Sequence, residues 1–344
     1  MSIPLSILDL APIATNGTAA GTFAESVELA RTAEAFGYSR VWYAEHHNMA
    51  GIASSATAVL IGHIAHHTSR IRLGAGGIML PNHSPLVIAE QFGTLETLFP
   101  GRIDLGLGRA PGSDQATFRA LRRDPAASDA FPQDVQELQA FLGATSRIPG
   151  VSAYPGRGTN VPLYILGSSL FGARLAAQLG LPYSFASHFA PDALTQAVAL
   201  YRAEFRPSPQ LAEPHVIAGV GVVAAESNAQ AQSIMESVRR DRIQRFLGRG
   251  RETPFTEDEV DMLLESPAGE SILQMLAYTA VGTPAAVKEY LEGFAEHARA
   301  DELITVHNAP EAADRLMSVR LTARAMGLAA AAGADADATL AARA

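Results

Sequence analysis

Apolar and polar residues follow two alternating periods along this chain. Short runs of aliphatic or β-branched residues, typical of buried strands, are each followed by a segment in which apolar residues recur with helical spacing. Eight such runs cover residues 4–10, 40–44, 71–80, 102–107, 162–166, 183–186, 215–224 and 302–306. Eight successive strand–helix units predict an α/β fold, a closed eight-stranded parallel (β/α)8 TIM barrel; an open doubly wound sheet is the alternative.

Helix boundaries are signalled locally in several places. Thr22 and Glu25 form a capping-box pattern that predicts the start of the first helix, and Gly37 predicts its end. Thr283 before Pro284 fits a helix N-cap with proline in the first turn. Further helices are expected over residues 54–68, 84–99, 133–142, 170–179, 191–205, 226–246, 284–298 and 311–328.

Two stretches interrupt the alternation within a single predicted domain, residues 1–328. Residues 110–160, after the fourth strand, are rich in Gly, Pro, Ser and Arg and predict a surface excursion. Residues 247–280, before the last pair of helices, predict a second irregular excursion. Residues 329–344 are of Ala/Asp low complexity, and we expect this tail to be disordered.

Composition excludes several classes of function. The chain has 344 residues, of which 48% are hydrophobic and 18% charged, and its net charge of −9 makes nucleic acid a poor partner. Cysteine is absent, which removes disulfides, thiolate metal sites and a cysteine nucleophile. Lys288 is the single lysine, so a Schiff-base enzyme or a Walker-type phosphate loop is disfavoured. No apolar run reaches membrane-spanning length and the N-terminus lacks the features of a signal peptide, so we expect a cytoplasmic protein without membrane contact.

Candidate chemistry begins at the end of the second strand, in Ala44-Glu45-His46-His47. Adjacent histidines after an acid are consistent with metal ligands, with a general base oriented by its neighbour, or with ordinary loop histidines. Because successive side chains of a strand face opposite ways, only one of the pair is expected to point into a barrel mouth.

A second group of histidines lies on the second predicted helix. Their spacing of three and four residues places them on one helix face. No carboxylate and no strand end accompanies them, so a polar or interfacial face is favoured and no metal site is predicted. The group comprises His63, His66 and His67.

The third strand, Leu73-Gly-Ala-Gly-Gly-Ile-Met-Leu-Pro81, contains three glycines. Glycines inside a strand weaken it, and they indicate either a structural bulge or the close approach of a flat ligand. The sequence leaves both interpretations open.

The fourth and fifth strands end in residues suited to an anion. Arg109 follows a GxGxxxG stretch that Pro111 interrupts, so a dinucleotide loop is disfavoured, and an arginine at a barrel mouth suits a phosphate. Ser168 and Ser169 precede a predicted helix, where they either cap it or bind an anion together with its free N–H groups. Because the two strands are neighbours in the predicted barrel, these residues predict a phosphate pocket, with the cofactor ring over the glycine-rich strand.

In these motifs the chain resembles the bacterial luciferase-like flavin monooxygenase family, in its single-chain oxidoreductase subgroup. The resemblance runs from PLSILDLAP to RLMSVRLTARAMG, and the order and spacing of its motifs are specific. They are AEHH at 44–47, LGAGGIMLPNHSP at 73–85, FPGRIDLGLGRAPGS at 99–113, GSSLFGARLAAQLGLP at 167–182 and VGTPAAVKEYL at 281–291.

The resemblance implies a barrel that binds reduced FMN at its mouth. His46 matches the catalytic histidine of the family, and Gly76-Gly77 matches a bulge that carries a non-proline cis peptide behind the isoalloxazine ring. Luciferase has an acidic residue where Ser168 stands and a hydroxyl where Gly172 stands. The cofactor-binding positions implied here are Glu45, Gly76, Gly77, Arg109, Leu166, Gly167, Ser168, Ser169 and Gly172.

The resemblance also implies a reaction. A separate flavin reductase would supply reduced FMN, which reacts with O2 to a flavin hydroperoxide that inserts one oxygen atom into a small organic substrate; light emission is not expected. Residues 247–280 match a mobile lid, and the second and third helices match the interface of a homodimer. A deazaflavin-dependent, hydride-transferring dehydrogenase and a non-catalytic flavin-binding protein are the alternatives. The pocket walls would come from the regions of Asp9, Leu10, Ser187 and His188, and from the lid.

Overall fold

The strands of this chain close into one parallel barrel. The computed structural model describes residues 3–14, 16–110, 115–248, 251 and 253–329. Each barrel strand pairs with the next, and closure follows because β6 pairs with β7, β7 with β9 and β9 with β1. The prediction of an eight-stranded TIM barrel is therefore confirmed. The barrel strands are β1 (Leu5–Asp9), β2 (Arg40–Tyr43), β3 (Arg72–Met79), β4 (Ile103–Gly108), β5 (Leu163–Gly167), β6 (Tyr183–Phe185), β7 (Val216–Ala224) and β9 (Glu302–His307).

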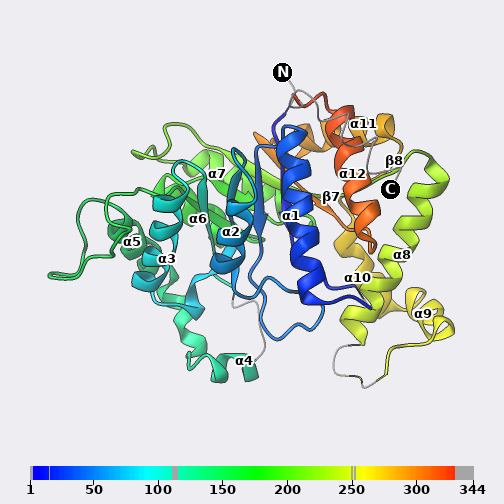
Figure 1. Cartoon of the computed structure of the whole chain (residues 1–344), viewed down its shortest axis with the longest axis horizontal. Coiled ribbons are helices and arrows are strands. Elements are labelled where there is room, and N and C mark those ends of the chain that lie inside the picture. The colour runs from blue at the N-terminus through cyan, green and yellow to red at the C-terminus, as the bar shows by residue number, and fades with distance from the viewer. Residues whose placement is uncertain (1–2, 15, 111–114, 249–250, 252, 330–344) are drawn as a thin grey trace.

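Helices surround the barrel, as Figure 1 shows for α1 and α12 in front of the strands. Within the described part of the chain, none is both long and apolar enough to cross a membrane. The predicted helices all occur, with ends shifted by a few residues. They are α1 (Ala19–Ala35), α2 (Thr57–His66), α3 (Pro85–Leu98), α5 (Phe131–Leu142), α6 (Leu170–Leu179), α7 (Leu194–Glu204), α8 (Asn228–Leu247), α11 (Pro284–Ala298) and α12 (Ala312–Ala325).

The predicted capping box at the start of α1 is wrong. The N-cap is Thr18, whose hydroxyl accepts a hydrogen bond from the backbone N–H of Gly21 at 3.1 Å. Thr22 lies inside the first turn, and its hydroxyl donates to the carbonyl of Pro12 at 3.3 Å. Thr18 and Thr22 both precede apolar residues. The backbone becomes helical directly after Thr18, so Thr18 is the N-cap.

The two excursions are more regular than the sequence predicted. The first, residues 110–160, adds α4 (Gln115–Ala120) and a 3-10 turn (Pro125–Ala130) before α5, and a further 3-10 turn (Leu80–Asn82) precedes α3. The second, residues 247–280, contains α9 (Glu257–Leu264), α10 (Pro267–Leu273) and a 3-10 turn (Gln274–Leu276). It ends in a ninth strand, β8 (Thr279–Gly282), which pairs with the carboxyl half of β7. Residues 330–344 of the predicted tail lie outside the described residues.

The α4 and α9 excursions lie on the side of the molecule where the strands end. In Figure 1, α4 lies at the lower edge and α9 at the lower right, near the level at which α1 begins after β1. Since α1 follows β1, this edge carries the carboxyl ends of the barrel strands. Function in this fold is found at that end.

The barrel strands are buried on both faces, as expected for parallel strands that helices cover. Every residue of β4 and of β7 is buried, and these two strands read as nearly continuous apolar runs. The largest fully buried side chains include Trp42, Tyr43 and Phe92. The core therefore lies partly inside the barrel and partly between the barrel and its helices.

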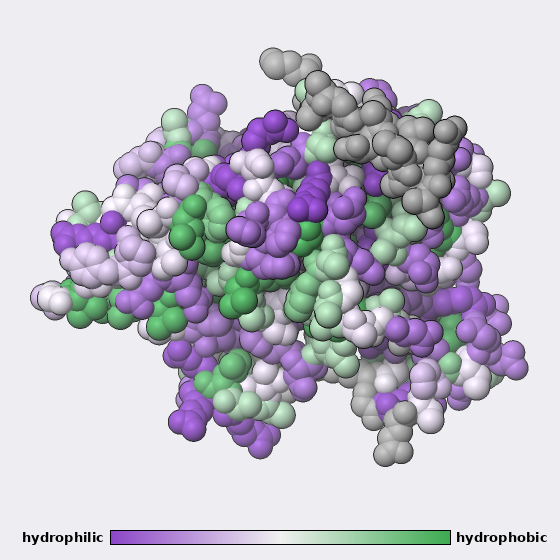
Figure 2. Space-filling model, in the orientation of Figure 1, coloured by the Kyte–Doolittle hydropathy of each residue, from purple (hydrophilic) through white to green (hydrophobic). Residues whose placement is uncertain are grey.

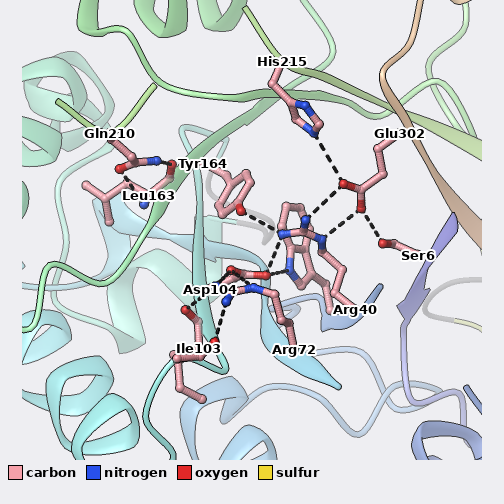
Figure 3. Close-up of polar contacts among 12 residues, drawn as sticks. Ser6, Arg40, Arg72, Ile103, Asp104, Leu163, Tyr164, Gln210, His215 and Glu302 are labelled. Carbon is pink, nitrogen blue, oxygen red and sulfur yellow. Dashed lines mark hydrogen bonds and ion pairs between the residues drawn. The ribbon is translucent and has the colours of Figure 1, made fainter. Parts of the chain in front are cut away.

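A charged network fills the amino end of the barrel interior (Figure 3). Nη1 of Arg40 lies 2.8 Å from Oδ2 of Asp104, and Nε of Arg40 lies 2.9 Å from Oε1 of Glu302. Arg72 pairs with Asp104, and Tyr164 accepts a hydrogen bond from Arg40 at 2.7 Å. Asp104 and Glu302 are buried, and each charge has an opposite partner, which buried charges require. The sequence analysis did not identify this layer, although an Asp inside an apolar strand is its signal.

Candidate functional site

The predicted site residues come from four strands that are neighbours in the barrel. Glu45 and His46 follow β2, Gly76 and Gly77 lie in β3, and Arg109 follows β4. The remaining positions, Leu166, Gly167, Ser168, Ser169 and Gly172, span the end of β5 and the start of α6. All are therefore at the carboxyl end of the barrel, on one half of its rim.

The glycine pair of β3 forms a bulge. The Gly76–Gly77 peptide bond is cis, and the pairing of β3 with β4 shifts register between Ala75 and Ile78. A Cβ at position 76 would lie 2.7 Å from Cδ1 of Leu8, and a Cβ at position 77 would lie 2.8 Å from the carbonyl oxygen of Gly106. Glycine is thus required here by the surrounding barrel itself.

Arg109 lies against the start of α6. Its guanidinium carbon is 4.2 Å from the ring centre of Phe171, in the first turn of that helix. Its Nε donates to the carbonyl of Ser128 at 3.3 Å, and its Nη2 lies 3.8 Å from the exposed carboxylate of Asp129. Arg109 and the start of α6 are therefore neighbours in space, as the phosphate-pocket hypothesis requires.

The N-terminus of α6 is open to an anion. Ser169 occupies the N-cap position, but its side chain makes no capping hydrogen bond, and both Ser168 and Ser169 are exposed. Capping by the serine hydroxyl, one of the two interpretations of the sequence, is therefore not what this helix uses. The first-turn N–H groups and the helix dipole favour a negative charge at this point.

Two further glycines, Gly167 and Gly172, lie where α6 packs on β5, and a Cβ at either position would make only ordinary van der Waals contacts. A Cβ at Gly172 would lie 3.6 Å from Cα of Gly167 and 3.4 Å from the ring of Tyr183. The hydroxyl of Tyr183 donates to the carbonyl of Ser169 at 3.1 Å and fixes the turn. Leu166 is half-buried beside this turn. A direct contact of these positions with a cofactor stays a prediction.

The two adjacent histidines lie in different surroundings. His46 is the more buried, and its Nδ1 has no hydrogen-bond partner among the described residues. Burial lowers the pKa of His46 below its ordinary value, against the opposing effect of Glu45. Nε2 of His47 instead lies 2.7 Å from Oε1 of Glu45, and this hydrogen bond raises the pKa of His47. His46 is thus a neutral, available base or donor, while His47 is held by its neighbour.

Glu45 is a buried carboxylate with several partners. Nε2 of His83 lies 2.9 Å from Oε1 of Glu45, and the backbone N–H of Met79 donates to its Oε2 at 3.0 Å. Burial alone would raise the pKa of Glu45, but the hydrogen bonds with His47 and His83 bring it to about 2. Glu45 thereby ties the loop after β2 to the end of β3. Its contact with a cofactor stays a prediction.

Glu45, His47 and His83 are also the group whose donor atoms lie close enough for a metal ion, within 4.8 Å of one another. Their donor atoms hydrogen-bond to one another, so the carboxylate is engaged by both rings. This arrangement orients the loop without requiring a cation.

The three histidines at the end of α2 lie close together at the surface, with their rings tilted or edge-on to one another. The rings of His63 and His67 are 4.6 Å apart, and Nδ1 of His67 donates to the carbonyl of His63 at 2.9 Å. His66 lies 5.5 Å from His67. The three residues share one helix surface, as their spacing predicts.

Asp9 and His188, two residues predicted to line the substrate pocket, have different surroundings. Asp9 is buried, with its carboxylate bonded to the hydroxyl of Ser26 at 2.7 Å and to the N–H of Ala11 at 2.8 Å. His188 is half-buried, its Nδ1 is fully buried, and burial lowers the pKa of His188 to about 3, helped by the charges of Arg242 and His46. His188 follows β6, and its ring lies beside Gly219 of β7.

Three residues that complete this region were missed from the sequence. His83 lies in the motif LPNHSP and Phe171 in the motif GSSLFG, but the sequence analysis assigned neither residue a function. Arg242 lies in an Arg-rich helix with no local signal that separates it from its neighbours. In the structure its charge contributes to the low pKa of His188.

The sequence matches the model of the family described as luciferase-like monooxygenase over residues 3–302. An Escherichia coli K12 protein named luciferase-like monooxygenase is 49% identical over 304 residues, covering 88% of this chain and 91% of that protein. The N-acetyl-S-alkylcysteine monooxygenase of Bacillus subtilis is 36% identical over 274 residues, covering 77% of this chain and 80% of that protein.

Solved structures share the fold. The crystal structure of apo-MsnO8 has a TM-score of 0.85 and 36% identity, covering 96% of this chain and 100% of that chain. Two structures of lower identity show the fold alone. They are the oxygenating component of 3,6-diketocamphane monooxygenase in complex with FMN (TM-score 0.70, 16% identity, covering 94% and 97%) and an F420-dependent secondary alcohol dehydrogenase (TM-score 0.69, 15% identity, covering 95% and 99%).

Proposed function

The chain belongs to the luciferase-like monooxygenase family, and from this premise we propose that it is the oxygenating component of a two-component monooxygenase that uses reduced FMN and O2. The observation that carries the proposal is the contact of Arg109 with the first turn of α6 at 4.2 Å, beside an N-terminus that its own serine does not cap. This arrangement suits a phosphate monoester, because a guanidinium and free backbone N–H groups face the same point.

The other residues of the rim fit the rest of FMN. Gly76 and Gly77 present backbone without side chains on β3, the strand next to the one that carries Arg109. His46 has a buried Nδ1 that lacks a partner among the described residues. A hydrogen-bonding ring beside His46 would supply a partner for this nitrogen, whereas the Cβ positions of Gly76 and Gly77 are filled by the barrel itself. Bound reduced FMN would supply the electrons that activate O2 for the transfer of one oxygen atom to the substrate.

The protein's own residues have three tasks in this proposal. Arg109 and the α6 turn hold the phosphate and so fix the position of the ring. His46, neutral because burial lowers its pKa, holds or accepts a proton at Nδ1. Glu45 orients the loop that carries His46 through its bonds to His47 and His83. The excursion 247–280 would cover the site and exclude water, as a lid does.

The substrate is proposed to be a small organic molecule. One relative with 36% identity is named for N-acetyl-S-alkylcysteine, a thioether, so sulfur compounds belong in the first substrate panel together with aldehydes and ketones. A flavin reductase is the proposed transient partner, and the cytoplasm is the proposed location.

The cofactor is tested first by binding. The purified protein would be titrated anaerobically with reduced FMN and with the reduced deazaflavin coenzyme, and we expect tighter binding of FMN. With NADH, a flavin reductase and isotopically labelled O2, mass spectrometry of the substrate panel should detect a product that carries one labelled oxygen atom. Tighter binding of the deazaflavin with hydride transfer in the absence of O2 would contradict the proposal. Binding of FMN without any oxygenated product would favour a non-catalytic flavin-binding protein.

We also propose a homodimer through α2 and α3. Large apolar side chains are exposed on these helices: Val59 on α2 and Leu98 on α3 are 75% and 64% exposed. Figure 2 shows apolar side chains gathered over this part of the surface. Such a patch is typical of an interface. Sedimentation of the protein and of a Val59→Glu/Leu98→Glu variant should give a dimer and a monomer, respectively; a monomeric parent protein would refute the assignment.

A further inference from the structure

Phe171 is a large aromatic residue that lies partly in solvent at the start of α6. It is the second residue of the helix, after Ser169 as the N-cap, and it is 39% exposed. The apolar core of α6 is formed by other residues, among them Ala173 and Ala176. The neighbour of the Phe171 ring is instead a charged side chain.

The guanidinium of Arg109 lies over the ring of Phe171. Its central carbon is 4.2 Å from the ring centre, well inside the separation of about 6 Å at which a cation is attracted to an aromatic face. Among the described residues, one other arginine lies this close to an aromatic ring, Arg251 at 4.1 Å from that of Phe255. The remaining described pairs of this kind are separated by 5.3 Å or more.

The other contacts of Arg109 with described residues are weaker. Its Nε donates to the carbonyl of Ser128 at 3.3 Å, which is longer than an ordinary N–H···O hydrogen bond. Its Nη2 lies 3.8 Å from Oδ1 of Asp129, whose side chain is 83% exposed, so solvent screens this ion pair. The ring of Phe171 is therefore the firmest support of the guanidinium among the described residues.

The backbone of Phe171 belongs to the same proposed phosphate site. The N–H groups of a first helical turn have no partner inside the helix, and the side chain of Ser169 makes no capping hydrogen bond. The first turn of α6 also contains no acidic residue that would compete with an anion. Phe171 thus contributes one of the backbone donors and, through its ring, the support of the arginine.

We propose that Phe171 is a positioning residue of the cofactor site, whose ring holds the guanidinium of Arg109 beside the start of α6 so that both face one phosphate. The N–H donors of a guanidinium lie in its plane, so a ring beneath that plane leaves them free for a ligand, whereas a carboxylate would occupy them. This inference rests on the proposed function, in which Arg109 binds the phosphate of FMN.

A direct contact of Phe171 with the ring system of the cofactor would have a different signature. Riboflavin carries the same ring system as FMN without the phosphate. A residue that acts through Arg109 changes the affinity for FMN alone, whereas a residue that touches the flavin ring changes the affinity for both. The comparison of the two flavins therefore separates the two roles.

The test is anaerobic calorimetry of the full-length protein with reduced FMN and with reduced riboflavin. Phe171→Leu keeps an apolar side chain but removes the aromatic face, so it should weaken FMN binding by about 3–10-fold and leave riboflavin binding unchanged. Phe171→Tyr keeps the face and should bind FMN within about 2-fold of the parent protein. An unchanged FMN affinity in Phe171→Leu, or equal losses for both flavins, overturns the proposal.

Two further variants serve as controls. Phe99 ends α3, before β4 begins, and its ring centre is 5.9 Å from the guanidinium of Arg102, so Phe99→Leu alters a similar pair at the other end of the barrel. It should leave both flavin affinities unchanged, and a loss as large as that in Phe171→Leu would overturn the proposal. Asp129→Asn removes a negative charge and should leave the FMN affinity unchanged or raise it. A loss in Asp129→Asn would make the carboxylate the support of Arg109 and overturn the proposal.

A double-mutant cycle shows whether Phe171 acts through Arg109. In an Arg109→Gln protein there is no guanidinium to position, so adding Phe171→Leu should leave the FMN affinity within about 2-fold. If the two losses multiply instead, Phe171 acts independently of Arg109 and the proposal is overturned.

The contact itself is tested without a cofactor. In flavin-free protein with isotopically labelled arginine, NMR should show one side-chain resonance that disappears in Arg109→Gln. In the parent protein the ring current of Phe171 should shift this resonance upfield, and the shift should vanish in Phe171→Leu. An Arg109 resonance without such a shift in the parent protein overturns the proposal.

The same measurements distinguish this inference from the proposed function. If the parent protein binds FMN no better than riboflavin, the phosphate site of the proposed function fails, and this inference fails with it. If the parent protein prefers FMN and Phe171→Leu retains the preference in full, the positioning role of Phe171 fails alone.

Discussion

The guanidinium of Arg109 lies 4.2 Å from the ring centre of Phe171 and so joins the end of β4 to the first turn of α6. The contact orients the guanidinium of Arg109. Among the described residues, its one ionic partner is the exposed carboxylate of Asp129, at 3.8 Å. An arginine held by an aromatic face, rather than by an acid, keeps its N–H donors available for a ligand.

Replacement of Arg109 is therefore expected to act on the phosphate of the cofactor. Arg109→Gln should weaken FMN binding by about 10–100-fold, the range for a charge-assisted hydrogen bond of about 1.5–3 kcal/mol. Riboflavin, which lacks the phosphate, should bind the parent protein and the variant equally. Fluorescence titration with both flavins measures the difference.

A control for this variant is available on α6, the helix that Arg109 contacts. Arg174 on α6 is exposed and pairs with Glu204 on α7 at 3.3 Å, so Arg174→Gln should leave both flavin affinities unchanged. Equal loss of FMN and riboflavin affinity in Arg109→Gln would instead indicate a disturbed fold and contradict the assignment of Arg109 to the phosphate.

The space around Gly77 predicts a cost for any side chain there. A Cβ would lie 2.8 Å from the carbonyl oxygen of Gly106, a backbone atom of the neighbouring strand that cannot rotate away. Gly77→Ala should lower the free energy of unfolding by about 1–3 kcal/mol, the usual cost of overpacking. Gly293→Ala on the exposed face of α11, where nothing lies within 4 Å of the new Cβ, should be neutral or stabilising. Urea denaturation compares the two, and equal stabilities would argue against the steric account.

The charged layer in the barrel predicts a second stability effect. Asp104 accepts from Arg40 and Arg72 and from Nε1 of Trp42. Asp104→Asn therefore leaves Arg72 without its carboxylate and leaves the buried Arg40 with Glu302 as its one remaining acidic partner among the described residues. Loss of one partner of a buried pair costs about 3–5 kcal/mol, and denaturant titration should show a loss of this size.

The half-exposed pair of Arg174 and Glu204 provides the comparison. Glu204→Gln should change the free energy of unfolding by less than about 1 kcal/mol, because solvent screens the charges. A similarly small effect of Asp104→Asn would mean that the barrel layer tolerates an uncompensated charge.

The barrel could be predicted from the sequence because each of its strands is buried on both faces and reads as a short apolar run. β4 and β7 illustrate this, with every residue buried. β8 was missed, since its four residues pair only with the end of β7 and carry no run of their own. The start of α1 was placed wrongly because two threonines offered a cap and only the backbone selects between them.

The site was predictable where its residues stand next to strand ends. Arg109 and Ser169 were expected to meet because β4 and β5 are consecutive strands, and the contact of Arg109 with the start of α6 agrees with this. Arg242 could not be found in this way, because it lies within α8, far in sequence from any strand end. Proximity across the barrel is a property of the closed sheet and leaves no local pattern.

A buried histidine away from the site predicts how stability depends on pH. His307 bonds to Oγ of Ser318 at 2.7 Å and to Oγ1 of Thr305 at 3.2 Å, and burial lowers its pKa to about 3. The unfolded chain takes up a proton near pH 6.5, whereas the folded protein does so only near pH 3. Stability contributed by the neutral ring is therefore lost progressively as the pH falls below 6.5.

His307→Gln removes this titration. Between pH 7 and pH 5 the parent protein should lose about 2 kcal/mol more unfolding free energy than the variant, from a cost of 1.36 kcal/mol for each pH unit. Denaturant titrations at pH 7 and pH 5 measure this difference. An equal loss of unfolding free energy in the parent protein and in His307→Gln would contradict the explanation by burial of His307.

The surroundings of His46 predict the pH dependence of catalysis. Burial lowers its pKa, so the neutral ring persists below pH 6.5, and the acid limb of the product-formation rate should lie below that value. His46→Asn should reduce the rate by about 10²–10⁴-fold, the contribution of a general base, while FMN affinity stays within about 2-fold. Glu45→Gln should move the acid limb to lower pH, because the carboxylate raises the pKa of His46 more strongly than the charge of His47 lowers it. A purely structural role for Glu45 would change the rate without moving the limb. Stopped-flow and product assays from pH 5 to pH 8 separate these outcomes, and an acid limb above pH 6.5 in the parent protein would exclude His46 as the titrating group.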